Sequence, residues 1–394
     1  MKILRVIFLA LSIHQLVLAQ EKKEEFISLL TDMEVQIDMT DAVNNMYNFK
    51  FVAAEVEFLK LRDKYPHHPM PYFLMGLSNF WKMQPNDDYR QFDKDFFAYM
   101  DSSIKYAEPM AESKDEKIQV ESAFFLSAAY GFRGRMYAER NKMFSAIPDG
   151  KKAMQYMQKS KNNGDLSPEF MFGDGLYNYY MAWFSENYPI FKPIIILFPK
   201  GDKKMGIDQL IFCGSNAFFT RTEAQAYLLM IYKEEGRMKD AINLGKYLNT
   251  TFPDNPYFER MYCRYVFSAG NFLETKRLAL DIMTKIDSGY SGYEEVSGRY
   301  ASYMMGYVCE FEKKYEDAKT YFKRTVAFSE KIDAVKMAYY LHACARLARI
   351  YKKEGNMAEA CVYYQKVKKH AKAKEEESLL IEAKEFFEQH HCKK

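Results

Sequence analysis

The chain of 394 residues lacks the signatures of several large functional classes. It contains no G-x-x-x-x-G-K-[ST] phosphate loop and no G-x-S-x-G nucleophile turn. It has no C-x-x-C pair, so neither a zinc ribbon nor a redox dithiol is indicated. Its carboxylates are scattered over predicted helix faces and single out no acid–base pair. We therefore predict a protein that is not an enzyme and needs no cofactor.

An excess of charge of one sign is also missing. Lys and Arg number 56 against 53 Asp and Glu, and two of the basic residues lie in the first nineteen positions. Without that segment the balance is 54 − 53 = +1. A chain so close to neutral gives no reason to expect nucleic acid as a partner.

The N-terminal segment has the three parts of a secretory signal. Lys2 and Arg5 form a basic start, residues 6–18 are mostly apolar, and Val17-Leu18-Ala19 is a small-residue cleavage site. We predict that residues 1–19 are a signal peptide and that the mature chain begins at Gln20, in the periplasm or outside the cell. No Cys follows the cleavage site, so a lipoprotein anchor is not indicated. An uncleaved anchor is the alternative.

Beyond the signal, long apolar runs are absent. The most apolar stretch, residues 189–199 (PIFKPIIILFP), holds three prolines and is about half the length of the roughly 20 residues that a span needs. We expect no membrane span in the mature chain. The same stretch is the basis of an alternative function, a helical protein that binds a ligand or a lipid through residues 189–199.

What the sequence does contain is a clear tetratricopeptide-type unit between Thr222 and Pro256. A helix–turn–helix repeat of this kind cannot bury its own apolar face and has to stack on neighbours, which leaves a long concave surface. The pattern residues are Leu228, Leu229, Tyr232, Gly236, Ala241 and Pro253. Every strong period in the chain is near 3.6 residues. We predict an all-α, tetratricopeptide-like solenoid.

Similar units flank this one with varying regularity. Residues 20–170 are predicted to form divergent helical repeats, including one long helix over about 118–144. Residues 171–394 are predicted to form the regular repeats. A final helix over about 375–389 has no successor and is expected to cap the stack.

Residues 172–210 carry a family resemblance. They read F-G-D-G-L-Y-N from Phe172, then Pro189 with Lys192, then G-D-K-K-M-G-I-D-Q-L from Gly201. This order resembles the core of the eukaryotic tetratricopeptide-39 and inclusion-body-clearance family. The resemblance implies a helical-repeat protein without known catalytic chemistry. Apart from the resemblance, Gly173 and Gly175 form a lone G-x-G, which indicates close helix packing rather than a dinucleotide site.

Cysteine and histidine raise questions of cross-linking and metal binding. Five of the six cysteines lie in helical patterns beside apolar residues, which favours packing as small buried side chains. One disulfide is the alternative, with Cys344 and Cys361 as the best candidate pair. His67 and His68 lie between two prolines and are expected to be solvated. Residues 390–392 (HHC) could attract a metal, but they lie near the terminus, and we predict no metal site.

The predicted binding site is the concave face. The first helix of each pair lines that face, and its inward positions recur every three to four residues. Tyrosine and arginine dominate these positions and are favoured at interface hot spots. The candidate residues are Tyr257, Arg260, Arg264, Phe267, Tyr300, Tyr303, Tyr307, His342, Arg349 and Lys352. Alternatively, several of the tyrosines fill seams between helices.

These observations predict an exported scaffold that binds an extended segment of a protein partner on its concave face. The partner's identity does not follow from the sequence, and association with a cell-envelope complex fits the predicted location. A third interpretation is an enzyme subunit whose catalytic partner is another chain.

Overall fold

The structure is a computed structural model that describes residues 26–188, 196, 198–372, 376–390 and 392. The predicted signal peptide and most of the apolar stretch 189–199 therefore lie outside the described residues. All regular secondary structure in the described ranges is helical, and each helix packs mainly on its neighbours in the chain. The predicted all-α solenoid is confirmed.

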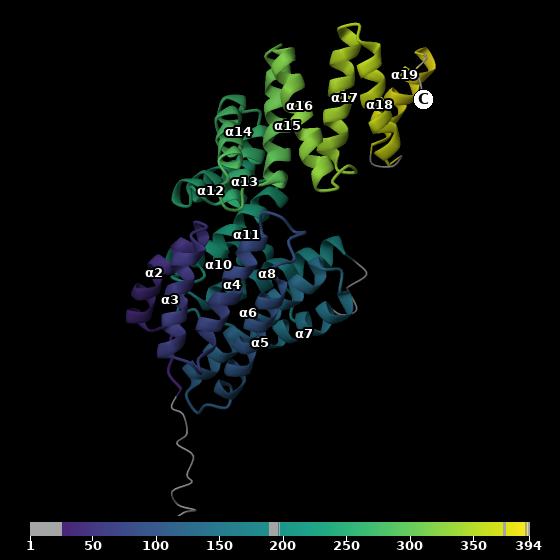
Figure 1. The fold of residues 1–394 in the computed structure, drawn as a ribbon. Helices are drawn as coiled ribbons and strands as arrows, with labels where there is room; N and C mark the ends of the chain where they lie inside the picture. Colours follow the sequence, from purple (N-terminus) through teal and green to yellow (C-terminus); the bar gives the residue numbers. More distant parts are fainter. Residues whose placement is uncertain (1–25, 189–195, 197, 373–375, 391, 393–394) are drawn as a thin grey trace, which may run out of the picture.

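The helices form two lobes (Figure 1). The first lobe contains α2 (Met33–Tyr47), α3 (Phe51–Lys64), α4 (Pro69–Met83), α5 (Asp93–Met110), α6 (Glu116–Glu139), α7 (Met143–Lys159), α8 (Phe170–Asn187), α10 (Lys203–Asn216) and α11 (Arg221–Glu234). The second lobe contains α12 (Met238–Thr251), α13 (Pro256–Ser268), α14 (Phe272–Asp287), α15 (Glu295–Phe311), α16 (Tyr315–Lys331), α17 (Ala338–Lys353), α18 (Met357–His370) and α19 (Glu377–Gln389).

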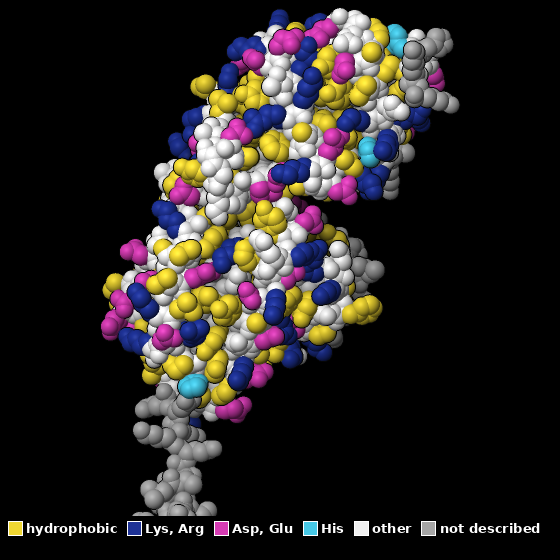
Figure 2. Space-filling view, in the orientation of Figure 1, with side chains coloured by type: hydrophobic (Ala, Val, Ile, Leu, Met, Phe, Trp, Pro, Cys, Tyr) yellow, Lys and Arg dark blue, Asp and Glu magenta, His cyan; other side chains and the backbone are white. Residues whose placement is uncertain are grey.

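Inner and outer helices alternate along the chain. In the first lobe α2, α4, α6 and α8 each contact the next of these four helices, and in the second lobe α13, α15, α17 and α19 do the same. These inner helices form one continuous layer in each lobe, and the helices between them lie outside. The space-filling view shows a hollow between the two lobes, on the right-hand side (Figure 2).

A left-handed residue closes the turn within many of the pairs. A backbone φ near +60° reverses the chain after an inner helix, and glycine adopts it at no steric cost. The residues with this conformation in six equivalent turns are Phe49, Asn141, Gly236, Gly270, Lys313 and Gly355. The Gly236 turn separates α11 from α12 as the repeat pattern predicts.

Asn141 explains why the predicted helix over residues 118–144 is wrong. The helix α6 ends at Glu139, and Asn141 has a φ of 58° before α7 begins at Met143. Asn tolerates this conformation better than most residues because its short polar side chain bonds locally. Without a glycine, the turn gave no strong signal in the sequence.

The helix pair α8–α10 packs closely through glycine. A Cβ on Gly175 would lie 2.7 Å from Leu210 Cγ, and one on Gly206 would lie 2.5 Å from the backbone nitrogen of Tyr179. The interpretation of Gly175 as a packing residue is confirmed. Gly173 differs, because its Cβ would meet only Met157 Cγ at 3.7 Å.

The core divides at a different place from the predicted boundary at residue 170. One cluster of buried side chains extends from Leu29 to Tyr265, and a second extends from Tyr262 to Phe386. The clusters meet in α13. Residue 170 lies inside the first cluster, so the boundary predicted from the regularity of the repeats does not coincide with the division of the core.

Glu223 on α11 binds two helices from the start of the chain. Its Oε1 accepts a hydrogen bond of 2.6 Å from Trp81 Nε1 on α4 and one of 3.0 Å from the Tyr47 hydroxyl at the end of α2. All three side chains are buried. Burial raises the pKa of Glu223, and the two donors oppose that rise because they stabilise the charged form. The contact bends the first lobe back on itself.

Three further contacts extend this closure to the start of the second lobe. The side chain of Asn255, the N-cap of α13, donates to the backbone oxygen of Tyr47 at 2.7 Å. The backbone nitrogen of Asp254 donates to Asn48 Oδ1 at 2.9 Å. The Trp81 ring lies 5.3 Å from the ring of Phe258. The beginning of the chain is thus buried against α11 and α13.

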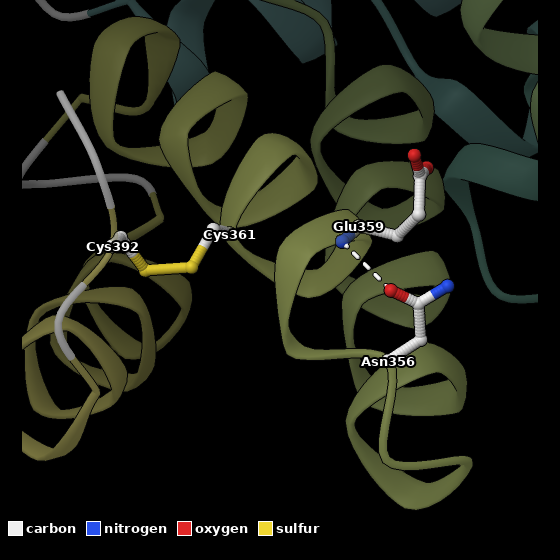
Figure 3. Close-up of a disulfide and its surroundings, with 4 residues drawn as sticks. All are labelled: Asn356, Glu359, Cys361 and Cys392. Atoms are coloured by element: carbon white, nitrogen blue, oxygen red, sulfur yellow. Dashed lines mark hydrogen bonds between the residues drawn. A yellow bond between two sulfur atoms is a disulfide. The ribbon is translucent and has the colours of Figure 1, made fainter.

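The C-terminal helix covers the end of the second lobe. Leu379, Ala383 and Phe386 of α19 are buried against α17 and α18, as expected for a cap. A disulfide joins Cys361 on α18 to Cys392 beyond α19 (Figure 3). The predicted pair of Cys344 with Cys361 is wrong. Cys344 is fully buried in α17 and has a free thiol, as do Cys213, Cys263 and Cys309.

The position of His68 also differs from the prediction. It was expected to be solvated, but it is 6% exposed and caps α4, with Nδ1 accepting from the backbone nitrogen of Met70 at 3.1 Å. Its Nε2 lies 3.2 Å from Glu121 Oε1 on α6. Glu121 in turn accepts from the backbone nitrogens of Leu29 and Leu30. His68 is therefore part of the packing between the first helix pairs.

We expect Trp81→Phe to destabilise the protein more than Trp183→Phe, which makes the same chemical change on the half-buried surface of α8. Loss of Nε1–H removes a donor from the buried Glu223 carboxylate, and a buried polar group left short of a partner costs about 1–3 kcal/mol. Urea unfolding measures both variants. Equal costs would show that the hydrogen bond to Glu223 contributes nothing beyond ring size.

Candidate functional site

The candidate site lies on the inner helices of the second lobe. Because α13, α15 and α17 contact one another in order, inward residues on each helix contribute to one surface. Tyr300 of α15 occupies the middle of this surface. The guanidinium carbons of Arg264, Arg299 and Arg260 lie 4.7, 4.9 and 5.8 Å from the centre of its ring. A ring in this position attracts cations through its electron-rich face.

Aromatic side chains continue the surface toward α17. Tyr303 stacks on Tyr339 at 4.5 Å, and Tyr300 meets the same ring edge-on at 5.0 Å. The ring centre of Tyr307 lies 5.1 Å from that of Phe267 on α13. The guanidinium carbon of Arg346 on α17 lies 4.4 Å from the same ring centre. Tyrosine offers a large apolar area with a polar tip, which suits such a surface. We call Arg264, Phe267, Tyr300, Tyr307, Tyr339 and Arg346 the tyrosine–arginine surface.

Two predicted site residues are buried in seams instead. Tyr303 is only 6% exposed, which supports the alternative that some tyrosines fill the space between helices. Arg260 is 7% exposed, and its Nη1 donates to the backbone oxygen of Pro85 at 2.8 Å and to Ser297 Oγ at 3.1 Å. Arg260 therefore joins the two lobes and cannot also face a partner. Tyr257 is half-buried beside it.

Arg349 and Lys352 lie apart from the tyrosine–arginine surface. The Nε of Arg349 donates to Glu382 Oε1 on α19 at 2.7 Å, and Lys352 Nζ lies 5.5 Å from the centre of the Phe386 ring. His342 Nε2 lies 3.7 Å from a carboxylate oxygen of Glu376. These three side chains hold the capping helix, so the predicted strip is divided between two places.

The arginines of this region differ in whether a carboxylate neutralises their charge. Arg346 donates to Glu310 Oε2 at 2.6 Å and forms an ion pair with it. Within the described ranges, Arg264 and Arg299 have no carboxylate within ion-pair distance. Arg299 is buried, and its Nε has no hydrogen-bond partner there. The region around Tyr300 is consequently short of negative charge.

Glu294 is an acidic residue that interacts electrostatically with Arg260. It caps α15, and its Oε2 accepts from the backbone nitrogen of Val296 and from Asn86 Nδ2 of the first lobe. Burial raises its pKa to about 7, although the charge of Arg260 opposes that rise. At neutral pH this carboxyl group is only partly ionised, so it balances the arginines incompletely.

Sequence reasoning missed Arg299, Tyr339 and Arg346. The pattern of the last repeat was aligned on His342 and Arg349, three residues further along α17. Three residues correspond to a rotation of about 60° around a helix with 3.6 residues per turn. The positions that face α15 are therefore 339 and 346. A pattern that started at Tyr339 would have included Arg346, which lies seven residues further along the same face of α17.

Two further findings bear on the class of protein. No group of three or more His, Cys, Asp or Glu side chains in the described part of the chain is placed to hold a metal ion. None of the helices described is both long enough and apolar enough to cross a membrane.

Comparison with known proteins adds no family. No protein-family model matches the chain, and no curated protein matches it either. The resemblance of residues 172–210 to the tetratricopeptide-39 family stays a prediction.

We expect Glu294 to make stability depend on pH between about 4.5 and 7. Its folded-state pKa lies above the ordinary value of 4.5, so the folded protein binds more protons than the unfolded chain in this window. Stability therefore falls as pH rises through it. Thermal unfolding measured across this pH window should show that the stability of Glu294→Gln decreases less with rising pH than that of the wild type.

Glu295→Gln is the matched control. The hydrogen bond from Lys331 lowers the pKa of Glu295, despite partial burial. Glu295 thus contributes stability above its unfolded pKa that is lost as pH falls, the opposite sign. If both variants change the pH profile in the same direction, the role assigned to Glu294 is wrong.

Proposed function

We propose that this protein is an exported interaction scaffold that binds an extended, acidic segment of a partner protein on the tyrosine–arginine surface. The observation that carries the proposal is the ring of Tyr300 with the half-buried Arg264 beside it, since no carboxylate in the described part of the chain forms an ion pair with this arginine. A carboxylate from a partner would supply the missing charge. The neighbouring aromatic rings offer area for apolar side chains of the same segment.

The form of the surface favours an extended segment. Its residues come from three consecutive inner helices, which gives a strip rather than a closed pocket. Solenoids present such concave strips because each repeat turns slightly from the one before. The two lobes meet beside the strip, where Arg260 contacts Pro85, so the strip has a fixed boundary at that end.

Two observations support an export route. The sequence of residues 1–19 has the parts of a secretory signal. The Cys361–Cys392 disulfide is of a kind that persists in oxidising compartments and is rare in the cytosol. We therefore propose that the scaffold works in the periplasm or outside the cell.

Mass spectrometry of protein from its own cells tests the location. We expect an N-terminus near Gln20 and, without reduction, one linked peptide pair that contains Cys361 and Cys392. Cys213, Cys263, Cys309 and Cys344 should stay unmodified until the protein is unfolded, because they are buried. An intact Met1 together with six reduced cysteines would contradict export.

Selection of short random peptides on the immobilised protein tests the binding surface. We expect enrichment of peptides with Asp or Glu next to apolar residues. Arg264→Ala should lower the affinity for the selected peptides by at least about 5-fold, which corresponds to about 1 kcal/mol for a hot-spot residue. The change should leave thermal stability nearly unaltered, because Arg264 is only half-buried.

Arg324→Ala is the control, since Arg324 lies on the outer helix α16 and pairs with Asp287. It should leave peptide affinity unchanged. Selected peptides without acidic residues, or equal binding by wild type and Arg264→Ala, would place the binding site elsewhere.

A further inference from the structure

A cavity of about 130 Å³ lies in the first lobe, away from the tyrosine–arginine surface. Residues of α6, α7, α8 and α11 line it, and its exposed wall is mostly apolar. A second cavity of about 30 Å³ adjoins it and shares the walls of Phe124, Ala128, Phe132 and Phe172. Gly131, Met157 and Leu176 along its edge are half-buried, so the larger cavity is reachable from solvent between α6, α7 and α8.

Two glycines inside helices line this cavity. Gly131 lies in α6 and Gly173 in α8, and glycine inside a helix is less favourable than alanine. Neither is required by close packing. A Cβ would lie 3.9 Å from Ala153 Cβ at the first position and 3.7 Å from Met157 Cγ at the second, both ordinary contacts. Gly175, by contrast, is required by packing, because α10 lies too close to leave room for a Cβ at this position.

The cavity has one polar end. Arg135 Nη1 donates to the Tyr227 hydroxyl at 3.3 Å, and Arg135 Nε donates to Glu139 Oε1 at 2.8 Å. Arg135 Nη2 also donates to Gln84 Oε1 at 3.5 Å. A guanidinium has five N–H groups, so these three hydrogen bonds leave donors for an acceptor atom in the cavity. Glu139 already balances the charge of Arg135. An acceptor oxygen on a neutral molecule therefore suits this end better than an anion.

The opposite walls suit an aromatic ring. The rings of Phe124, Phe132 and Phe172 line the apolar part, and aromatic rings prefer edge-on or offset contacts with one another. An apolar cavity of about 150 Å³ stays dry and binds benzene. The size and lining of the present cavity match a single ring.

We propose that this cavity binds a small neutral aromatic molecule with one acceptor oxygen, its ring among the phenylalanines and its oxygen toward Arg135 and Tyr227. The site is independent of the proposed peptide surface. The walls come from α6, α7, α8 and α11, whereas that surface lies on α13, α15 and α17.

Titration of the full protein with acetophenone, ethylbenzene and benzoate, followed by NMR and calorimetry, tests the proposal. Acetophenone should bind, ethylbenzene should bind at least tenfold more weakly because it lacks the oxygen, and benzoate should also bind more weakly because of its charge. Tyr227→Phe should reduce the affinity for acetophenone and leave that for ethylbenzene unchanged. No binding of acetophenone to the wild type, or equal affinity for all three probes, overturns the proposal.

Gly173→Leu is the decisive variant, because its side chain would fill the cavity. This substitution should lower the affinity for acetophenone at least tenfold. The protein should stay folded, because leucine is a better helix former than glycine. Gly150→Leu is the control. Gly150 lies in α7, and a Cβ there meets nothing within 4 Å. Unchanged acetophenone binding in Gly173→Leu contradicts the site, and both variants should bind the selected peptides like the wild type.

Discussion

The hydrogen bonds from Trp81 and Tyr47 to Glu223 hold the first lobe closed, and the placement of the second lobe beside it depends on this closure. A buried carboxylate is costly unless donors satisfy it, so α11 is stable in its position only when α2 and α4 lie against it. The first lobe is thereby closed, and its inner layer is occupied by its own aromatic side chains. In the second lobe, half-exposed tyrosine and arginine side chains of the inner layer form the tyrosine–arginine surface.

The same device recurs at other junctions. Glu169, the N-cap of α8, accepts from the backbone nitrogens of residues 218–220 and so fixes the segment between α10 and α11. Glu121 binds the first described residues to α6. Glu259 in α13 accepts from the Tyr293 hydroxyl and from Lys285. Each of these carboxylates joins parts of the chain that are distant in sequence, and each is almost fully buried.

Local features of the fold were predictable from the sequence, and its long-range contacts were not. The repeat pattern between Thr222 and Pro256 locates α11, the turn at Gly236 and α12, because these depend on spacing within one helix pair. The turn at Asn141 was missed because it lacks glycine. The closure at Glu223 was missed for another reason. Trp81 and Glu223 are 142 positions apart, and no helical period records such a contact.

The candidate site shows the same division. Arg264 lies beside Tyr300 and Phe267 beside Tyr307, and both contacts could be anticipated because inward positions on α13 and α15 follow the helical period. The burial of Arg260 depends on Pro85, which reaches α13 from the other lobe. The engagement of Arg349 depends on where α19 docks. A pattern within one helix contains neither piece of information.

The closure of the first lobe also sets the order in which the chain can fold. Helices of the second lobe pack on partners that follow within a few tens of residues, whereas Asn48 meets Asp254 only after 206 further positions. A ribosome adds about 5–20 residues per second, so the apolar inner faces of α2 and α4 wait on the order of ten seconds or longer for α11 and α13. During synthesis the N-terminal helices are thus made first, but their final surroundings are complete only after α13 has been made.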